Sequence, residues 1–379
     1  MKLKLLILVI VAAAVGGYLV WQETQPVIPP VSDPGDTVNG LQIPAGFKLE
    51  VFAKNLPGAR VIIQDQFGNF WVSRPSKGVV TTLEMEAGKV RRQVDVFKNL
   101  KEPHGLALDP QHPFNLYIAE TNQISRAPLY SDGEMEKIAD LPSGSGHSTR
   151  TLGFGPDNRL YVSIGSSCNV CHESDSRRAK IFSMNPDGSD FREHARGLRN
   201  SVFFTWNYVD GRMWATEMGR DLLGDNLPPD EINIIETGKN YGWPNCYGKN
   251  IHDDAFDKNT YIRNPCMEPF EAGSHIDIPA HSAPLGLAFV PEEGWPEEYW
   301  YDLLVSYHGS WNRSTPTGYK IVRMKLDAKG NYAGSEDFIS GWLKGSVVSG
   351  RPVDLLIQPG GTLYITDDYA GVIYKLSQR

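Results

Sequence analysis

The chain has 379 residues, of which 41% are hydrophobic and 22% are charged, and its formal net charge is -8 at pH 7. A chain of this length can bury a large core, either in one large β architecture or in two domains. The acidic balance excludes nonspecific binding to nucleic acid, because neutralising phosphates requires an excess of Lys and Arg that this chain lacks. Any site for an anionic ligand must therefore be built locally.

The N-terminal segment has the pattern of an export signal. Two lysines precede an uncharged run from Leu5 to Gln22, which predicts a signal sequence or a membrane anchor over residues 1–22. A cut after Ala14 would leave apolar residues directly behind it, so we favour an uncleaved anchor. The prolines and polar residues of 23–40 predict an extended linker. The remainder is expected on the periplasmic or extracellular face, with membrane contact through the anchor only.

Six similar units follow along the chain. Each contains an apolar run, a turn of Asp, Pro, Gly or Asn, and a second apolar run rich in aromatic residues, which is the pattern of a β-hairpin. The units begin at Val61 (VIIQDQFGNFWVS), Gly105 (GLALDPQHPFNLYIAE), Leu152 (LGFGPDNRLYVSIG), Val202 (VFFTWNYVDGRMWATEMG), Leu285 (LGLAFVPEEGWPEEYWYDLLVSYHG) and Val353 (VDLLIQPGGTLYITDD). Their spacing of roughly 45 to 65 residues, with one longer gap, matches four-stranded propeller blades. We therefore predict an all-β fold, a six-bladed β-propeller over residues 41–379, with an irregular β-sandwich as the alternative.

The cysteine count indicates disulfides. Cys168, Cys171, Cys246 and Cys266 make an even number in a chain predicted to be exported, which favours two disulfides over free thiols. The sequence alone does not fix the pairing, and the simplest interpretation joins the first two and the last two. The longer gap between units, about Asn240 to Ser282, contains the second pair, so we expect an insertion tied down by that disulfide.

Basic residues precede the six apolar runs. In a propeller, the connection that enters each innermost strand lies on the face where the central channel opens, so these residues should surround one pocket. They are Arg60, His104, His147 with Arg150, Arg199 with Asn200, His281 and Arg351. Cations gathered in this way predict a ligand with several negative charges. The chain contains no Walker, nucleophile-elbow, HExxH or dinucleotide-binding glycine motif, so those classes lack support.

Five segments, in this order from the N-terminal side, resemble the soluble quinoprotein sugar dehydrogenases, the glucose/sorbosone dehydrogenase family. They are GHSTRTLGFGPDNRLYVSIG from Gly146, GLRN from Gly197, PPDEINIIETGKNYGWP from Pro228, HGSWNR from His308 and GRPVDLLIQPGG from Gly350. The resemblance spans roughly Leu41 to the C-terminus, and HGSWNR is closer to the sorbosone and pyranose dehydrogenase branch than to the glucose dehydrogenase branch.

The resemblance implies an oxidoreductase. Members of the family are six-bladed propellers that bind pyrroloquinoline quinone (PQQ), a tricarboxylate, beside a calcium ion on the channel face. The expected reaction is oxidation of a sugar, meaning an aldose, a sorbosone-like aldehyde or a polyol, with electrons passed to an external acceptor such as a cytochrome or a quinone. His147 matches the base that takes the hydroxyl proton while hydride passes to the quinone, a task that suits an imidazole. Arg199 matches the arginine that stabilises charge on the quinone oxygens.

Further site residues are implied in the same way. Asn200 and Arg351 match contacts to the cofactor, and we expect additional contacts to the cofactor or the substrate from His104, Arg150, His308, Trp311, Asn312 and Arg313. The calcium beside the cofactor would be held by backbone carbonyls at Gly219 and Arg220, with a carboxylate from Asp221. A second, structural calcium site would involve Asp230, Glu231 and Tyr241, for which an ordinary exposed acidic turn is the alternative.

Two departures from the family pattern leave other functions open. Ser166 stands where the glucose branch has the aspartate that orients the catalytic histidine, and a hydroxyl cannot stabilise imidazolium as a carboxylate does. Val353 stands where a second arginine would bind cofactor carboxylates, which suggests weaker binding or a replacement such as Arg313. The alternatives are a non-catalytic propeller that binds an anionic or glycan ligand, and a calcium-dependent lactonase, which would require a cluster of acids at the channel.

The stretch CNVCH, Cys168 to His172, also has the spelling of a c-type haem attachment site. A covalent haem needs an enclosing apolar pocket, and the charged segment ESDSRRAK that follows does not provide one. We therefore interpret Cys168 and Cys171 as a loop disulfide at the rim of the pocket, and His172 as a surface residue. A thioredoxin-like role is disfavoured, because that motif begins a helix in a βαβ unit.

Overall fold

A computed structural model describes residue 38 and the ranges 40–131 and 134–379. The predicted anchor, 1–22, and nearly all of the predicted linker, 23–40, lie outside the described residues. Within the described part, no helix is long and apolar enough to cross a membrane.

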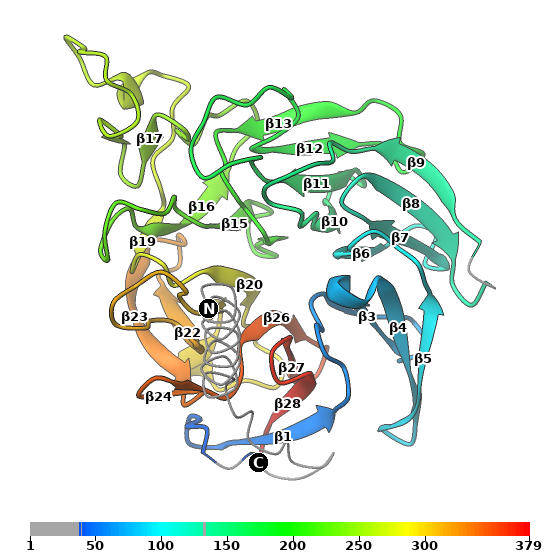
Figure 1. Cartoon of the computed structure of the whole chain (residues 1–379). Coiled ribbons are helices and arrows are strands. Elements are labelled where there is room, and N and C mark those ends of the chain that lie inside the picture. Colours follow the sequence, from blue (N-terminus) through cyan, green and yellow to red (C-terminus); the bar gives the residue numbers. More distant parts are fainter. Residues whose placement is uncertain (1–37, 39, 132–133) are drawn as a thin grey trace, which may run out of the picture.

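The described chain forms six four-stranded antiparallel sheets arranged around a central axis, as Figure 1 shows. The first three blades are β2 (Ile62–Gln64), β3 (Phe70–Arg74), β4 (Val79–Glu86) and β5 (Lys89–Phe97); β6 (Gly105–Leu108), β7 (Asn115–Ala119), β8 (Gln123–Pro128) and β9 (Glu136–Asp140); and β10 (Leu152–Phe154), β11 (Leu160–Ile164), β12 (Lys180–Met184) and β13 (Arg192–Arg196). The next two are β14 (Phe204–Trp206), β15 (Met213–Glu217), β16 (Asp230–Ile235) and β19 (Ile276–Ile278); and β20 (Pro284–Phe289), β21 (Leu303–Tyr307), β22 (Lys320–Leu326) and β23 (Tyr332–Ile339). The predicted fold class is confirmed.

The sixth blade joins the two ends of the propeller. Its inner strands are β26 (Pro352–Ile357), β27 (Leu363–Asp367) and β28 (Val372–Gln378), and its outermost strand is β1 (Phe47–Ala53). β1 runs antiparallel to β28, with Phe47 opposite Gln378. All six predicted hairpins are the two innermost strands of a blade, but the closing strand was not predicted, because it pairs residues from opposite ends of the chain.

Burial within a blade explains the sequence pattern. All five residues of β3, FWVSR, are buried, because an inner strand is covered by neighbouring blades on both faces. In the outermost strand β5, KVRRQVDVF, all residues but the last are exposed or partly exposed, and its charges lie at the edge, where they discourage pairing with another chain. The inner turns are closed by side chains. In the first blade, for example, Asp65 Oδ1 accepts the N–H groups of Phe67 and Asn69 at 2.9 and 3.0 Å.

The predicted insertion lies in the fourth blade, between β16 and β19. It contains the short hairpin β17 (Cys246–Tyr247) and β18 (Ile251–His252) and the 3-10 helix η2 (Pro265–Met267). The predicted disulfide between Cys246 and Cys266 ties it down. Elsewhere, the remaining short elements are η1 (Pro75–Lys77), η3 (Glu297–Tyr299) and the hairpin β24 (Leu343–Lys344) with β25 (Val347–Val348).

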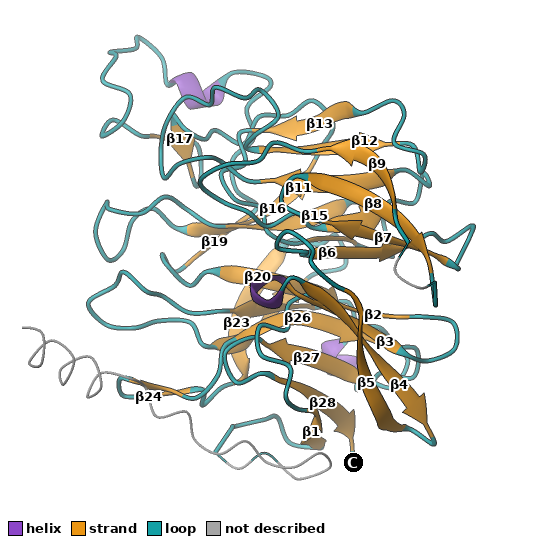
Figure 2. Ribbon diagram, turned by 45° about the vertical axis from the view of Figure 1, so that its right-hand side comes forward, coloured by secondary structure: helices purple, strands orange, loops and turns teal. Residues whose placement is uncertain are grey.

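The up-and-down order of the strands decides where the site lies. In a four-stranded meander, the connection into the first strand and the connection between the second and third strands are on the same side of the sheet. Two loops from every blade therefore gather on one face of the propeller, which can be followed in Figure 2. The inner turns lie on the opposite face.

Candidate active site

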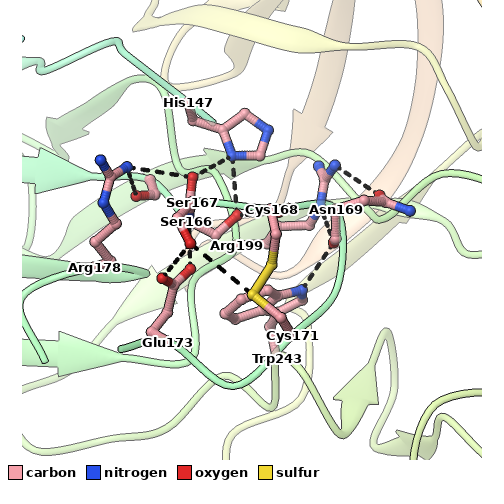
Figure 3. Close-up of a disulfide and its surroundings, with 11 residues drawn as sticks. His147, Ser166, Ser167, Cys168, Asn169, Cys171, Glu173, Arg178, Arg199 and Trp243 are labelled. Atoms are coloured by element: carbon pink, nitrogen blue, oxygen red, sulfur yellow. Dashed lines mark hydrogen bonds between the residues drawn. A yellow bond between two sulfur atoms is a disulfide. The ribbon is translucent and has the colours of Figure 1, made fainter. Parts of the chain in front are cut away.

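His147 and Ser166 form the centre of the site. His147 lies in the connection that enters β10, and Ser166 follows β11 in the same blade. Ser166 is fully buried, its carbonyl accepts the backbone N–H of His147 at 2.9 Å, and its own N–H donates to the carbonyl of Arg199 at 2.8 Å. The serine therefore connects the backbones that carry the predicted base and the predicted arginine (Figure 3).

The hydrogen bonds of Ser166 fix the tautomer of His147. The Ser166 hydroxyl donates to the carbonyl of Cys168 at 2.7 Å, so its proton is engaged. His147 Nδ1 lies 3.0 Å from that hydroxyl oxygen and 3.1 Å from the Ser166 carbonyl oxygen, so both neighbours act as acceptors toward it. Nδ1 therefore carries the ring proton, and Nε2 keeps the lone pair that a base requires. Ser166 thus orients the histidine, although it brings no charge.

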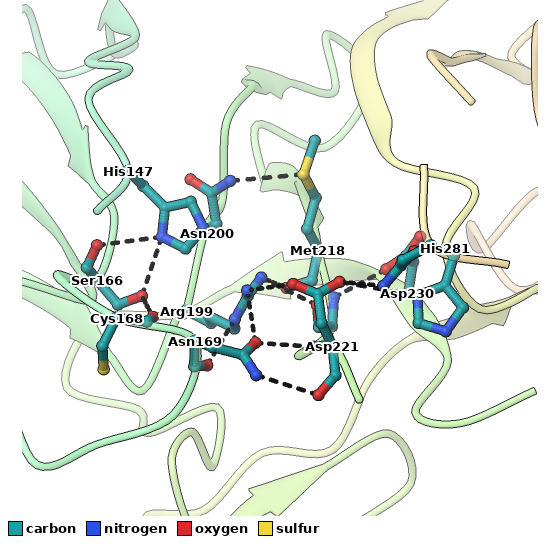
Figure 4. Close-up of polar contacts among 12 residues, drawn as sticks. His147, Ser166, Cys168, Asn169, Arg199, Asn200, Met218, Asp221, Asp230 and His281 are labelled. Carbon is teal, nitrogen blue, oxygen red and sulfur yellow. Dashed lines mark hydrogen bonds and ion pairs between the residues drawn. The ribbon is translucent and has the colours of Figure 1, made fainter. Parts of the chain in front are cut away.

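Burial and a nearby cation hold His147 neutral. Burial lowers its pKa to about 3, and the charge of Arg199 acts in the same direction. Figure 4 shows the imidazole beside Asn200, with Arg199 beneath. The space is narrow, since a methyl group on Gly165 would lie 2.6 Å from the His147 Cβ and 2.8 Å from the Asn200 Oδ1. Gly165 therefore permits the close approach of these two side chains.

Arg199 is buried and all its donors are engaged. Its Nε donates to the carbonyl of Asn169 at 2.9 Å, and Nη1 donates to the carbonyls of Met218 and Gly219 at 3.2 and 2.9 Å. Nη2 contacts Asn169 Oδ1 at 3.0 Å and Asp221 Oδ2 at 3.3 Å. Five N–H groups thus have five acceptors. Sequence reasoning missed Asn169, although its place between two cysteines directly after an inner strand was a usable signal.

The CNVCH segment is a disulfide loop, as predicted. Cys168 and Cys171 are bonded to each other, so their sulfurs are not available to attach haem. His172 is exposed, and its ring contacts that of Phe256 in the insertion, with centroids 5.2 Å apart. The insertion therefore covers the outer side of the loop.

A cationic pocket of about 650 Å³ lies on the same face as the loop that carries His147. It is lined by Arg60, Lys77, Glu102, His104, Ser148, Thr149, His308, Arg351 and Asp368, among others. Ser148 and Thr149 follow His147 directly in the chain, so the loop that carries the histidine contributes to the lining, although His147 itself does not. Asp368 is bonded to Arg60 and to His308, both at 2.9 Å. Although burial alone would raise the pKa of Asp368, these two partners lower it, so its carboxylate is ionised.

Two further residues of the pocket, Arg351 and His104, can interact with a ligand. Arg351 donates to the carbonyls of His308 and Gly309, and no carboxylate within the described ranges forms an ion pair with it. His104 is fully buried, and burial lowers its pKa well below the usual value, so it is neutral. Its Nε2 has no hydrogen-bond partner in the part of the chain that the structure describes, and it can accept a hydrogen bond from a ligand. The positive charge of the pocket therefore comes from its arginines and Lys77, and not from its histidines.

The structure corrects two expectations. Arg150 is fully buried, and its guanidinium donates to the carbonyls of His147, Thr149 and Pro142, so it supports the His147 loop and does not face the pocket. Arg313 donates to Asn226 Oδ1 and to a backbone carbonyl at the rim, so it does not replace the arginine expected at position 353. Val353 is a core residue, and the second guanidinium beside Arg351 is that of Arg60.

Asp221 lies where the first calcium was expected. Its Oδ1 accepts from Asn312 Nδ2 at 2.6 Å and lies 4.0 Å from His281 Nδ1, and its Oδ2 faces Arg199. Asn312 Oδ1 is buried without a hydrogen-bond partner, so an acceptor oxygen remains for a cation. Trp311, the neighbour of Asn312, is 76% exposed at the rim. The side chain of Arg220 is paired with Asp253 at 2.7 Å, and the oxygen that Arg220 can offer a cation is its backbone carbonyl.

The residues of the second predicted calcium site converge only in part. Neighbouring residues of a strand point to opposite faces, so Asp230 binds the N–H groups of Gly219 and Ala283, whereas Glu231 faces the other way. Glu231 and Tyr241 line a small internal cavity together with Glu217, the residue opposite Glu231 on β15. The cavity volume of about 20 Å³ accommodates roughly one water or ion. Burial raises the pKa of Glu217 to about 8 and that of Glu231 to about 7.

The arrangement of acids does not fit the lactonase alternative. Among the described residues, the one group of three or more His, Cys, Asp or Glu side chains with metal-binding geometry comprises Cys168, Cys171 and Glu173. The two cysteine sulfurs of this group are bonded to each other in the disulfide. His147 instead has Arg199 beside it, which favours chemistry that develops negative charge.

Comparison with known proteins agrees with this geometry. The model of the TrAA12-like family matches residues 41–379. An uncharacterized protein of Borreliella burgdorferi is 33% identical over 353 residues, covering 89% of this chain and 90% of that protein. The quinoprotein glucose dehydrogenase B of Acinetobacter calcoaceticus is 23% identical, covering 88% of this chain and 82% of that protein. The holo form of the pyranose dehydrogenase PQQ domain from Coprinopsis cinerea has a TM-score of 0.74 at 19% identity, covering 92% of this chain and 99% of that one. The resemblance to quinoprotein sugar dehydrogenases is confirmed, and the chain belongs to the TrAA12-like family.

Proposed function

We propose that the protein is a PQQ-dependent sugar dehydrogenase that passes electrons to an external acceptor. The observation that carries this proposal is a neutral histidine, oriented through Nδ1 so that Nε2 keeps its lone pair, in a loop whose next two residues line a cationic pocket. The names of the relatives support the same conclusion, since they include quinoprotein glucose and pyranose dehydrogenases.

His147 is the proposed base. Its Nε2 takes the proton of the sugar hydroxyl, and Ser166 holds the ring in the required orientation through Nδ1. When bound, PQQ would supply the two-electron acceptor, taking up a hydride that leaves the substrate carbon. Arg199 contributes through its positive charge, because all its N–H groups are already engaged in the protein.

The pocket residues fit an anionic quinone. Arg60 and Arg351 supply charge for carboxylates, and the unpartnered His104 Nε2 supplies an acceptor for a ligand N–H. His308 lines the same space, whereas Asn200 lies beside the His147 imidazole. A tricarboxylate would offset the charge of Arg199 and thereby raise the pKa of His147, which strengthens it as a base.

Calcium would be held near Asp221. The oxygens that fit a hard cation there are the Gly219 and Arg220 carbonyls, the Asp221 carboxylate and the unpartnered Asn312 Oδ1. For the second proposed site, Glu231 and Tyr241 border a cavity of suitable size, whereas the carboxylate of Asp230 is used by two backbone N–H groups. The two disulfides support export to an oxidising compartment. The proposal includes tethering of the exported protein to the membrane through residues 1–22.

The test is a titration of the purified full chain with PQQ and calcium, followed by addition of aldoses, sorbosone-like aldehydes or polyols with an artificial electron acceptor. We expect saturable binding and substrate-dependent bleaching of the quinone spectrum. His147→Ala should abolish bleaching, whereas His112→Ala, which changes an exposed histidine of an inner turn on the opposite face, should not. Binding without reduction by any of these substrates would favour the non-catalytic propeller, and no binding would refute the proposal.

A further inference from the structure

We propose that Asn169, held inside the Cys168–Cys171 loop, is the positioning residue for Arg199. The inference rests on the proposed function for its catalytic meaning, but the placement of Arg199 can be tested in the protein without cofactor. Asn169 touches neither the pocket lining nor His147, so it would act through the arginine.

Asn169 contacts Arg199 and its counterion from one position. Its carbonyl accepts the Arg199 Nε–H at 2.9 Å, and its Oδ1 accepts from Nη2 at 3.0 Å. The same Oδ1 accepts the backbone N–H of Asp221 at 2.8 Å, and its Nδ2 donates to the Asp221 carbonyl at 3.1 Å. One side chain thus fixes the distance between the guanidinium and the loop that carries the Asp221 carboxylate.

The disulfide makes this loop a firm support. The Cys168–Cys171 bond joins residues that are three positions apart, which restricts the backbone of Asn169 between them. On one side of the loop, the Cys168 carbonyl accepts the Ser166 hydroxyl that orients His147. At its base, Glu173 accepts both the N–H and the hydroxyl of Ser167, each at 2.7 Å. The loop therefore holds the arginine directly and the histidine through Ser166 (Figure 3).

The remaining acceptors of Arg199 do not replace Asn169. Without its side chain, Nη2 keeps only the longer contact to Asp221 Oδ2, at 3.3 Å, and Asp221 loses two bonds that hold its backbone. Arginine side chains have many rotamers, and fixed geometry is what makes a guanidinium effective against developing charge. Loss of Asn169 should therefore let Arg199 move while the propeller stays folded.

The first experiment measures the reactivity of individual arginines toward phenylglyoxal in the full chain without PQQ, by peptide mass spectrometry. In Asn169→Ala we expect Arg199 to react about tenfold faster than in the wild type, and fully buried Arg150 to stay protected. Asn169→Asp keeps the acceptor oxygens and should largely restore protection. The matched control is Asn185→Ala, which removes an asparagine bonded to Arg159 at 2.9 Å elsewhere in the blade and should leave Arg199 unchanged.

The pKa of His147, followed by NMR, provides a second readout. Because the charge of Arg199 lowers this pKa, its release should raise it, whereas a purely structural role would not. Unchanged protection of Arg199 in Asn169→Ala, or equal exposure of Arg199 and Arg150, would overturn the proposal. Failure of PQQ to bind the wild type would refute the proposed function and leave these two results intact.

The disulfides supply an independent comparison. Replacing Cys168 and Cys171 by serine should expose Arg199 to phenylglyoxal, as Asn169→Ala does. Replacing Cys246 and Cys266 by serine removes a disulfide from the insertion and should not selectively expose Arg199. If Arg199 reacted faster in the variant without Cys246 and Cys266 than in the variant without Cys168 and Cys171, the role of the Cys168–Cys171 loop would be contradicted.

Discussion

Glu217 should make the stability of the protein fall as the pH rises. Its side chain is 5% exposed, its Oε1 accepts the backbone N–H of Asn200 at 2.6 Å, and its other oxygen accepts the hydroxyl of Ser201. Burial raises its pKa from an ordinary 4.5 to about 8, and the charge of Glu231 acts in the same direction. The folded protein therefore keeps a proton on Glu217 that the unfolded chain has already lost at neutral pH.

The expected magnitude follows from this difference in pKa. A group whose pKa is raised by folding contributes stability that is fully present below its unfolded pKa and is lost as the pH rises through its folded pKa. Between about pH 5 and about pH 8, Glu217 should lower the free energy of unfolding by roughly 3 kcal/mol. Glu231, with a pKa of about 7, contributes in the same direction.

The assay is urea unfolding of the protein without metal across this pH range, for the wild type and for Glu217→Gln. The glutamine keeps an acceptor for the N–H of Asn200 but has no proton to lose, so the variant should show a pH-dependent loss that is smaller by roughly 3 kcal/mol. Comparing the two proteins cancels the contributions of other groups. An identical pH dependence in both would refute the conclusion that Glu217 is buried with its proton.

Three other perturbations test the site and the fold. Because the pKa of His147 in the protein without PQQ is lowered to about 3, its imidazole should stay neutral between about pH 5 and about pH 8, and an NMR titration of the cofactor-free protein with a midpoint near the ordinary histidine value would contradict this. Gly165→Ala should reduce kcat strongly and change the free energy of unfolding much less, since the new methyl group displaces His147. A crystal structure of the variant with the imidazole unmoved would refute this explanation. Leu49→Ala in the closing strand should lower the free energy of unfolding by roughly 2 to 5 kcal/mol and leave the site intact. A loss below about 1 kcal/mol, measured by chemical denaturation, would mean that β1 contributes little to closing the propeller.

The sequence by itself determined the repeat and the face on which the candidate site residues lie. An inner strand buried on both faces must be continuously apolar, and its turn must contain residues that tolerate tight backbone, so six copies of one pattern identified six blades. The alternation of strands places the segments before the inner strands on one face, which is why the sequence predicts that His147, Arg199 and Arg351 lie on the same face. The two disulfides were predicted for a similar local reason, since each joins cysteines that are near in sequence.

Contacts between distant segments were decided only by the tertiary structure. β1 completes a sheet with the C-terminal strands because closing the ring removes two exposed strand edges. The residues of β1 alone do not indicate which strand it pairs with. Arg150 looks like another pocket cation in the sequence, yet its side chain is buried against three carbonyls, whereas Arg60 reaches the pocket from a different blade. The partnership of Asn169 with Arg199 likewise depends on packing between two loops, because hydrogen bonds form wherever the fold brings donor and acceptor together, and sequence distance does not constrain them.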